Sequence, residues 1–468
     1  MADVAIVGGG IGGLTAAYAL QKRGVSFTLL EASSAFGGVI RSETEAGFSW
    51  EAGPDAILAQ KPEGIALCRE LGLGDRLVPT NPVVKAVYVL RRGRLHPLPE
   101  GMMLAVPTRI LPFVSSGLFS WPGKLRMGMD LVIPARRENG DESIASFLRR
   151  RFGQESVDLL GEPLLAGIHS GDPERLSMHA TFARFVEMER RSGSLIRALM
   201  FAPRAPHGSH TSAFYSLEGG LATLVDALVA RVPAESLRRN TAVSSLRRDP
   251  TSFRVETGGN GVGVGVGVGV IEAKVVILAV PPPKAAPLLS QLDGALAGGL
   301  ASVSCASTAT VVLGYRRSDV AHPLDGYGLL VPRTEGLRTS ALSFVSTKFP
   351  GRAPGDHVLL RAFMGGVRDP RVLDFDDGEI IDLVRREMAP VLGLRGEPVV
   401  SRVHRWPEST PQMEVGHLEK VAAFEARLPA VPGLFVTGAG LRVTGIPDVV
   451  ADATRTAESA AAYLASVG

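Results

Sequence analysis

The most constraining feature of this sequence is a glycine-rich turn between a short apolar run and an alanine-rich segment. Residues 4–7 read Val-Ala-Ile-Val, and Gly8, Gly10 and Gly13 follow with the spacing Gly-x-Gly-x-x-Gly. Residues 14–23 are rich in Ala and Leu and predict a helix that ends at Gly24. A second apolar run, 27–30, leads to Glu31. The order strand, turn, helix, strand and acid predicts the start of an α/β domain.

Each part of this unit has a physical role in binding a dinucleotide. Gly8 permits a tight turn, Gly10 leaves room for a pyrophosphate, and Gly13 lets the helix approach the strand. The N-terminus of the helix offers free N–H groups and a positive dipole to phosphate. Glu31 can accept hydrogen bonds from a ribose diol. A lone glycine motif would be weak evidence, but the complete context disfavours a turn without a ligand.

The segment after Glu31 narrows the cofactor. Residues 37–42 read Gly-Gly-Val-Ile-Arg-Ser. This segment resembles the second signature of FAD proteins of the amine-oxidase type, and specifically the protoporphyrinogen oxidase family, which includes bacterial coproporphyrinogen III oxidases. Further resemblances occur at residues 53–55, 162–177, 215–221, 348–354, 402–407 and 412–418. The resemblance therefore covers nearly the whole chain.

Composition excludes several other classes of protein. The 468 residues favour two or three domains, and a net charge of +3 from 50 basic and 47 acidic residues does not suggest a nucleic-acid binder. Two cysteines cannot form a disulfide framework. We expect no signal peptide, no transmembrane helix and no metal site. The expected location is cytoplasmic, with peripheral contact at the inner face of the cell membrane.

The resemblance implies an α/β (α+β) fold with a discontinuous Rossmann-type FAD-binding domain, expected at residues 1–79, 215–280 and 402–468. A mixed-sheet substrate domain is expected at 81–100 and 281–401. A helical region is expected at 101–210, with residues 178–200 as one helix and 204–210 as a linker. The alternation of Gly and Val at 261–270 predicts a ribbon of poorly specified register, which we interpret as structurally incidental.

Residues 101–137 combine Met and aromatic side chains with basic ones. Met103, Phe119 and Trp121 are examples, and prolines at 107, 112, 122 and 134 predict short helices. Such a segment suits weak peripheral contact with a membrane. A helical subdomain that packs its own core is an equally good interpretation.

The resemblance also implies the residues that hold a non-covalent FAD. They are Gly8, Gly9, Gly10, Ile11, Gly12, Gly13, Glu31, Ala32, Gly38, Arg41, Gly53, Pro54, Asp55, Val243, Trp406, Gly438, Thr444, Gly445 and Ile446. One departure from the family's pattern is Pro447 where Asn is usual, before a matching Asp448. We expect Pro447 to begin the C-terminal helix.

Four substrate-binding residues follow from the same resemblance: Lys85, Gly167, Leu330 and Phe349. Lys85 is expected to pair with a propionate, although a solvated charge on a strand is an equal alternative, and Phe349 is expected to pack on a pyrrole ring. Arg91, Arg92 and Arg94 lie near Lys85 as further candidate cations. A second departure, His169 in place of an aromatic residue, bears on substrate fit.

The implied activity is oxidation of protoporphyrinogen IX to protoporphyrin IX in heme biosynthesis. No second Gly-x-Gly-x-x-Gly unit for a nicotinamide cofactor is visible, which favours oxygen as acceptor and hydrogen peroxide as product. Residues 349–354 resemble the plant-type members of the family, and this resemblance favours protoporphyrinogen over the alternative, coproporphyrinogen III. An amine oxidase and a non-catalytic flavin-binding protein are the rival hypotheses. Expected partners are the porphyrinogen, oxygen, a membrane surface and, as a candidate, ferrochelatase.

Overall fold

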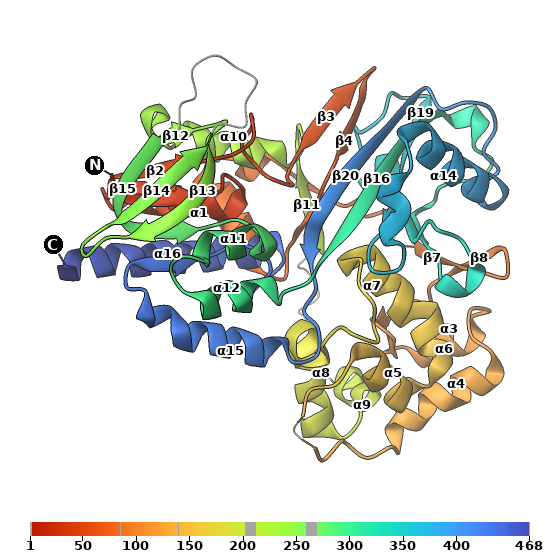
Figure 1. Ribbon diagram of the computed structural model, residues 1–468. Coiled ribbons are helices and arrows are strands. Elements are labelled where there is room, and N and C mark those ends of the chain that lie inside the picture. Colours follow the sequence, from red (N-terminus) through yellow and green to blue (C-terminus); the bar gives the residue numbers. More distant parts are fainter. Residues whose placement is uncertain (1, 85, 139, 202–211, 259–268, 468) are drawn as a thin grey trace.

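The computed structural model describes residues 2–84, 86–138, 140–201, 212–258 and 269–467. Three parts are distinguishable in Figure 1: an α/β part that holds both ends of the chain, a second large sheet, and a helical region below that sheet. The expected mixture of α/β and α+β structure is confirmed.

The first sheet has the order β12-β2-β1-β15-β14-β13, and β21 also pairs with β15. Strands β1, β2, β12, β15 and β21 are parallel to one another, whereas β14 pairs antiparallel with β15 and with β13. The bounds are β1 Ala2–Val7, β2 Phe27–Leu30, β12 Leu237–Arg238, β13 Ala242–Arg248, β14 Phe253–Gly258, β15 Gly269–Leu278 and β21 Leu434–Val436.

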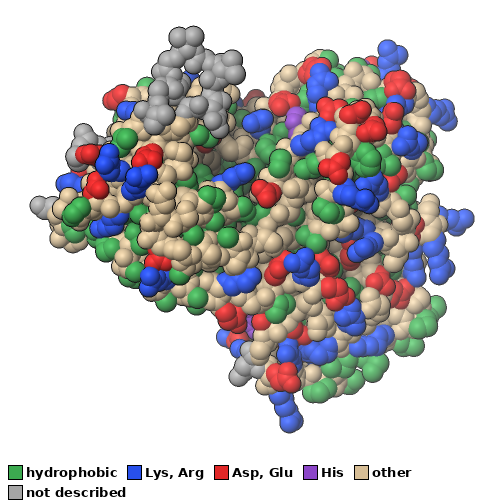
Figure 2. All heavy atoms as spheres, viewed as in Figure 1, with side chains coloured by type: hydrophobic (Ala, Val, Ile, Leu, Met, Phe, Trp, Pro, Cys, Tyr) green, Lys and Arg blue, Asp and Glu red, His purple; other side chains and the backbone are tan. Residues whose placement is uncertain are grey.

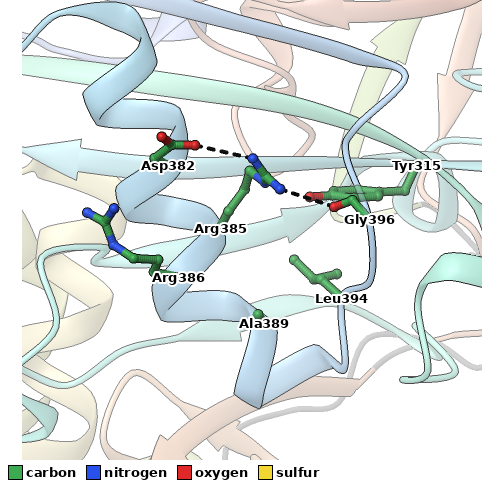
Figure 3. Close-up of a pocket in the computed structure, with 7 residues that line it drawn as sticks. All are labelled: Tyr315, Asp382, Arg385, Arg386, Ala389, Leu394 and Gly396. Carbon is green, nitrogen blue, oxygen red and sulfur yellow. Dashed lines mark hydrogen bonds and ion pairs between the residues drawn. The ribbon is translucent and has the colours of Figure 1, made fainter.

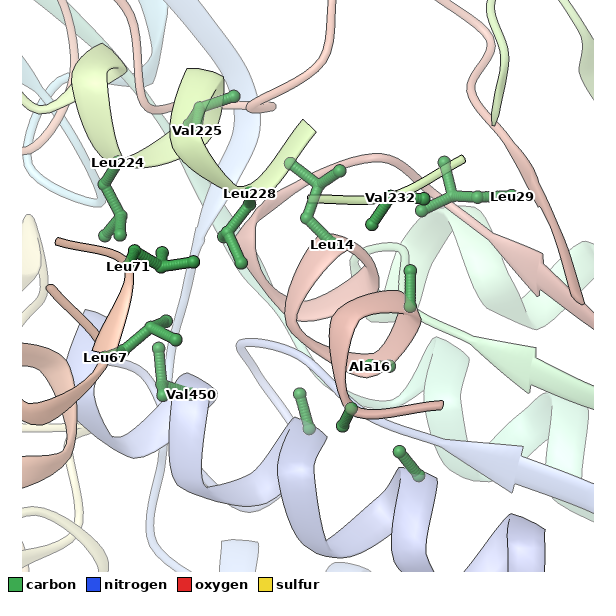
Figure 4. Close-up of a cluster of buried hydrophobic side chains, with 14 of the residues drawn as sticks. Leu14, Ala16, Leu29, Leu67, Leu71, Leu224, Val225, Leu228, Val232 and Val450 are labelled. Atoms are coloured by element: carbon green, nitrogen blue, oxygen red, sulfur yellow. The ribbon is translucent and has the colours of Figure 1, made fainter. Parts of the chain in front are cut away.

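Alternate residues of β1 pack into different cores because side chains of a strand alternate between the faces of the sheet. Val4 and Ile6 join a cluster with helices α1, α2, α10 and α16, part of which Figure 4 shows. Ala5 and Val7 join a cluster with α11, α12 and α15 on the other face. The helices are α1 Ile11–Gln21, α2 Pro62–Glu70, α10 Ala222–Ala230, α11 Pro282–Leu289, α12 Gly294–Ala301, α15 His417–Arg427 and α16 Ile446–Val467.

The second sheet has the order β20-β16-β19-β18-β17-β7-β8. Among the described strands of this sheet, β17 and β7 pair in parallel and the other pairs are antiparallel. The bounds are β7 Ala86–Arg91, β8 Arg94–Pro97, β16 Cys305–Arg316, β17 Gly326–Leu330, β18 Ala341–Phe344, β19 His357–Gly365 and β20 Val400–Pro411. Helices α13 Val345–Lys348 and α14 Asp377–Leu392 belong to this part.

Two expected domain boundaries differ from the observed sheets. Strand β20, expected in the FAD domain from residue 402, pairs with β16 of the second sheet. Helices α11 and α12, expected in the substrate domain, pack on the first sheet through Leu289 and Leu296. Sequence alone could not place these segments, because strands and helices of both parts have the same hydrophobic patterns.

Short sheets join the two parts. The hairpin of β3 and β4 comes after the glycine-rich turn in the chain. In another small sheet, β11 lies between β5 and β6. Strands β9 and β10 form a small pair at the start of the helical region. The bounds are β3 Ser42–Glu45, β4 Phe48–Glu51, β5 Ile57–Leu58, β6 Leu77–Pro79, β9 Met102–Met103, β10 Val106–Pro107 and β11 Phe214–Leu217.

The helical region packs a core that includes Phe113, Phe119 and Met127 and extends to Leu330 and Ala341 of the second sheet. The single helix expected over 178–200 is wrong: Gly193 takes a left-handed conformation, and Ser194 caps a new helix. The helices are α3 Ile110–Ser115, α4 Trp121–Gly128, α5 Ile144–Phe152, α6 Gln154–Ser156, α7 Glu162–His169, α8 Met178–Ser192 and α9 Leu195–Met200. The expected linker at 204–210 and most of the Gly-Val repeat lie outside the described residues.

A buried ion pair holds this helical region together. Arg151 of α5 donates from Nε to Asp130 (2.6 Å) and from Nη2 to Gly193 O (2.9 Å). Asp130 also accepts from Ser194 Oγ (2.6 Å) and Ile196 N (2.9 Å). Both charged side chains are fully buried. The pair therefore connects α5 to the junction between α8 and α9.

We expect Arg151→Met to lower the free energy of unfolding by about 3–5 kcal/mol, because it leaves the Asp130 charge buried and unpaired. Urea denaturation followed by circular dichroism measures the change. The matched control in the same helix is Arg149→Met, which breaks an exposed pair with Glu174 and should cost about 0–1 kcal/mol. Equal losses in the two variants would contradict a structural role for the buried pair.

Candidate active site

The glycine turn between β1 and α1 packs tightly against the backbone at Gly8 and Gly13 and is open at Gly10. A Cβ atom at Gly13 would lie 1.9 Å from Gly8 O, and one at Gly8 would lie 2.7 Å from Ala279 O. Gly8 also has a φ of +107°, which favours glycine. A Cβ at Gly10, by contrast, would meet no atom within 4 Å. The open side of the turn therefore lies at Gly10, where the sequence predicts a pyrophosphate.

Two further segments from distant parts of the sequence meet this turn. Gly37 N donates to Gly9 O (2.8 Å), and a Cβ on Gly38 would lie 3.4 Å from the Cα of Gly10. A Cβ on Gly12 would lie 3.3 Å from the Cα of Gly438. Three of the predicted FAD-binding segments thus converge on one place.

Glu31, the acid predicted to bind ribose, lies at the other end of the region where these segments meet the glycine turn. Glu31 follows β2, and its carboxylate accepts from Gly9 N (2.7 Å) and Ser33 N (2.8 Å). Ala32 follows Glu31 in the same turn. Thr241 N donates to Glu31 O (2.8 Å), and this bond brings the start of β13, which contains Val243, alongside Glu31. The cradle of Gly10, Glu31 and the N-terminus of α1, which begins with Ile11 and Gly12, fits a dinucleotide.

The segment 437–445, which precedes α16, is held rigidly against that helix. Asp452 accepts from Thr437 Oγ1 (2.7 Å) and from Arg442 Nε (2.7 Å), and His417 Nε2 lies 2.7 Å from Leu441 O. Thr444 and Gly445 lead directly into α16, which begins at Ile446, one residue before the expected Pro447. Asp448 in its first turn pairs with Lys61 (2.5 Å).

The turn at Ala52–Gly53 is clamped by three donors from the second sheet. Thr310 Oγ1 and Trp406 Nε1 both donate to Ala52 O (2.9 Å each), from β16 and β20. Arg361 Nη2 of β19 donates to Gly53 O (2.5 Å). Arg41, another predicted cofactor residue, lies over the Trp406 ring, 5.6 Å from its centroid. These bonds set the predicted flavin-side turn against the second sheet.

A cavity of about 580 Å³ lies between this turn, the second sheet and α7. Its wall contains Gly53, Pro54, Asp55 and Trp406 of the predicted cofactor residues and Gly167 and Leu330 of the predicted substrate residues. Tyr327, Lys348, Arg361 and Phe363 also line it but were missed by sequence reasoning. For Arg361 and Phe363, the available signal was their two-residue spacing on a strand, which puts both on one face.

Other predicted substrate residues are placed differently. Phe349 is buried and absent from the cavity wall, because α13 ends at Lys348 and it is Lys348 that lines the cavity. Arg91 pairs with Glu155 (2.7 Å), and neither Arg91, Arg92 nor Arg94 lines the cavity. Lys85 lies outside the described residues.

His169, at the end of α7, also lies off the cavity wall, edge-on to Phe182 with 6.4 Å between ring centroids. Burial lowers the pKa of His169, so that the ring packs as a neutral group. Its neighbour Ser170 lines the cavity instead. The departure at position 169 therefore acts through packing rather than through contact with a ligand in the cavity.

Charged groups gather at the end of the cavity beside Gly53. Lys348 Nζ lies 2.8 Å from Asp55 Oδ2. Burial opposes ionisation of Asp55, but Lys348 and Arg361 outweigh it and hold the pKa of that carboxyl below its ordinary value. Burial lowers the pKa of Arg361, against the attraction of Asp55 and Glu51. The rest of the wall is mainly apolar, with Leu164, Leu330, Ala341 and Phe363.

A second hollow, of about 370 Å³, lies between α14 and β16 (Figure 3). Its Arg385 donates to Gly396 O (3.2 Å) and to Asp382 (3.2 Å). It contains none of the predicted site residues. The convergence of motifs therefore selects the cavity beside Gly53 as the site.

Comparison with known proteins decides the family. The pattern of the family described as "Flavin containing amine oxidoreductase" matches residues 11–465. The chain belongs to this family. FAD is accordingly its cofactor, in agreement with the cradle at Gly10.

Relatives within the family are similar along nearly their whole length. The chain is 35% identical to "Coproporphyrinogen III oxidase" of Bacillus subtilis (strain 168), over 99% of this chain and 98% of that protein. It is 34% identical to "Coproporphyrinogen III oxidase" of Propionibacterium freudenreichii subsp. freudenreichii (97% and 89%). It is 29% identical to "Protoporphyrinogen oxidase, chloroplastic" of Nicotiana tabacum (93% and 81%).

Solved structures show the same fold. A structure from Exiguobacterium sp. 255-15 matches with a TM-score of 0.86 and 30% identity, over 97% of this chain and 98% of that chain. Cyclohexylamine oxidase from Brevibacterium oxydans IH-35A matches with a TM-score of 0.70 and 19% identity, over 99% of each chain. This chain is a flavin-dependent oxidoreductase by family.

We expect Gly10→Val to abolish FAD binding while the protein remains folded, because the new side chain occupies free space that the pyrophosphate needs. Flavin absorbance of the purified protein measures occupancy, and circular dichroism measures folding. Gly13→Ala should instead disturb the fold itself, because its Cβ would collide with Gly8 O. Gly298→Ala in α12, also in open space, is the control that should keep FAD. Normal flavin content in Gly10→Val would refute the placement.

Proposed function

We propose that this flavoprotein oxidises coproporphyrinogen III to coproporphyrin III, with oxygen as acceptor and hydrogen peroxide as product. The observation that carries the proposal is the cavity beside the Gly53 turn, which combines a large apolar wall with a cationic end. A porphyrinogen has the same division: an apolar macrocycle with acidic side chains at its edge. FAD, when bound, would supply the hydride acceptor that the redox chemistry needs.

The protein's own residues orient the substrate and exclude water. Leu330, Ala341 and Phe363 offer the apolar surface on which pyrrole rings can pack. Lys348 and Arg361 offer positive charge to carboxylates. The clamp on Ala52 and Gly53 keeps the predicted flavin-side turn at a constant position relative to this wall.

The choice of coproporphyrinogen over protoporphyrinogen rests on two observations. The segment whose sequence favours protoporphyrinogen IX contains Phe349, and the ring of Phe349 does not reach the cavity. Relatives named for coproporphyrinogen III are 35% and 34% identical, whereas the tobacco chloroplast relative named for protoporphyrinogen is 29% identical. Protoporphyrinogen IX, with fewer carboxylates, is the second candidate.

Two observations disfavour an amine substrate. The aromatic side chains of the cavity are Phe214, Tyr327, Phe363 and Trp406, and the ring pairs of the described residues include none between two of them. The cations Lys348 and Arg361 would also repel a protonated amine. Oxygen as acceptor is supported by the lack of a second dinucleotide motif in the sequence.

The direct test incubates the purified protein with each porphyrinogen in air and follows porphyrin fluorescence and hydrogen peroxide. We expect kcat/KM for coproporphyrinogen III to exceed that for protoporphyrinogen IX by about tenfold or more, the worth of one additional charged contact. A preference for protoporphyrinogen IX would overturn the substrate choice and leave the flavin chemistry standing. If neither porphyrinogen bleaches the flavin anaerobically, the result would indicate a non-catalytic flavin-binding protein.

We also propose that the helical region contacts a membrane surface. Among the described residues no helix is long and apolar enough to span a bilayer. Exposed apolar side chains nevertheless gather on α3, α4 and the turn after them, at the lower right of Figure 2. They are Ile110, Leu111, Val114, Trp121, Leu125, Met129, Leu131 and Val132. Phe119, expected on this surface, is buried in the core instead.

Replacing Leu111 and Leu125 by Ser should weaken binding to liposomes, because these side chains are 83% and 72% exposed and stabilise no core. Sedimentation with anionic liposomes measures the bound fraction, and we expect a decrease of about tenfold, from roughly 1.5 kcal/mol or more of lost apolar burial. Replacing Leu418 of α15 by Ser is the control, because Leu418 is an exposed leucine in another part of the chain. A parent protein that does not sediment with liposomes would refute the contact.

A further inference from the structure

One end of the cavity holds a guanidinium that is buried with few partners. Arg361 is only 4% exposed and lies in β19, opposite Ser343 of β18. Its Nη2 donates to Gly53 O (2.5 Å), while its Nε is buried with no hydrogen-bond partner. Because a guanidinium has five donors, this one remains largely unsatisfied by the described residues. Burying a charge in this way is costly unless a partner is supplied.

The neighbouring acids are already paired with other groups. Asp55 pairs with Lys348 (2.8 Å). Glu51 pairs with Arg352 (3.3 Å) and accepts from Ser42 Oγ (2.6 Å) and Leu221 N (3.0 Å). The two acids that attract Arg361 are thus shared with two other cations. Within the described part of the chain, this cluster has three cations for two acids and suits one further anion.

The sheet places this charge one step from the apolar wall. Arg361 and Phe363 are two residues apart on β19 and therefore point to the same face. Phe363 pairs with Ala341, and Ala341 pairs with Leu330, so that these side chains form an apolar row. Arg361 lies in the next row, toward Gly53 and Lys348. A ring packed on the apolar row would have its edge beside Arg361.

We propose that Arg361 and Lys348 form a carboxylate-binding subsite at the Gly53 end of the cavity, which receives a propionate of a tetracarboxylic porphyrinogen. The inference rests on the proposed function and deepens it. Coproporphyrinogen III has four propionates, whereas protoporphyrinogen IX has vinyl groups in place of two of them. A vinyl group at this subsite would leave Arg361 unpaired. A propionate would supply the missing anion in a charge-assisted hydrogen bond. The subsite would therefore select the four-acid substrate.

A simpler role for Arg361 is to hold the Gly53 turn by its bond to Gly53 O. The two roles predict different results. Loss of the clamp would impair every substrate alike, because it displaces the flavin-side turn. Loss of a carboxylate partner would impair only substrates that have a carboxylate at that position, and would raise KM more than it lowers kcat.

The test compares Arg361→Met, Arg361→Lys and the control Thr310→Val in the FAD-loaded enzyme. Thr310→Val removes another donor to the same turn without changing charge. We expect Arg361→Met to lower kcat/KM for coproporphyrinogen III by about 30-fold and for protoporphyrinogen IX by less than about threefold, as for loss of one partner of a buried charge pair. Arg361→Lys should retain most of the preference. Thr310→Val should affect both substrates equally.

Equal losses for both substrates in Arg361→Met would overturn the subsite and leave only the clamp. If that variant does not fold with FAD, Lys348→Met is the second variant, with the same expected selectivity and the same outcome that overturns it. An independent readout is absorbance titration of the oxidised enzyme with coproporphyrin III and with mesoporphyrin IX, which has two carboxylates. Weaker binding of coproporphyrin alone in the variant supports the subsite, and unchanged binding overturns it.

Failure of the proposed function is distinguishable from failure of the subsite. An enzyme that oxidises neither porphyrinogen would refute the activity. The titrations still decide the subsite in that case: preference for coproporphyrin III that disappears in Arg361→Met supports it, and equal binding of both porphyrins overturns it. An enzyme that oxidises both with no effect of position 361 on selectivity keeps the activity and loses the subsite.

Discussion

The structure depends on three hydrogen bonds that fasten one turn of the first domain to the second sheet. Ala52 O accepts from Thr310 and Trp406, and Gly53 O accepts from Arg361. The donors come from three different strands, so that the turn cannot move without disturbing β16, β19 and β20 together. Because this turn is part of the predicted FAD site and of the cavity wall, the same bonds fix the predicted cofactor side of the cavity relative to the second sheet. Two separate cores thereby act as one site.

The cofactor cradle shows how close packing and empty space are divided among glycines. Gly8 and Gly13 have no room for a side chain, because backbone atoms of the fold lie against them. Gly10 has room, and Gly38 lies just above it. The first kind of glycine supports the fold and the second leaves a place for a ligand. A sequence motif contains both kinds without distinguishing them, and only the packing separates the two roles.

The cavity also explains how an apolar macrocycle with charged edges could be held by so few side chains. Phe363, Ala341 and Leu330 form one row of the second sheet, and the charged side chain of Arg361 lies in the next. The pleat of a β-sheet thus brings an apolar surface and a buried cation side by side on a rigid support. Helix α7 of the helical region lies against this row at Gly167, and Leu164 and Gly167 also line the cavity. The core of the helical region is continuous with this row, because Leu330 and Ala341 belong to the same cluster. The buried pair of Arg151 and Asp130 fastens the helices of this region.

Local patterns along the chain were sufficient to predict several features of this protein. The β1–α1–β2 unit, its glycine-rich turn and the family were predictable, because the motif, its spacing and the buried strands are local features. Gly167 and Leu330, which the resemblance implies as substrate-binding residues, line the cavity beside Gly53. Only the tertiary structure decided that β20 belongs to the second sheet and that α11 and α12 belong to the first. It also replaced Phe349 by Lys348 and Phe363 on the cavity wall, and it brought Arg361 to Gly53 across 308 positions of the chain. These contacts join residues far apart in sequence, and the direction of a side chain there depends on sheet register, which no local pattern specifies.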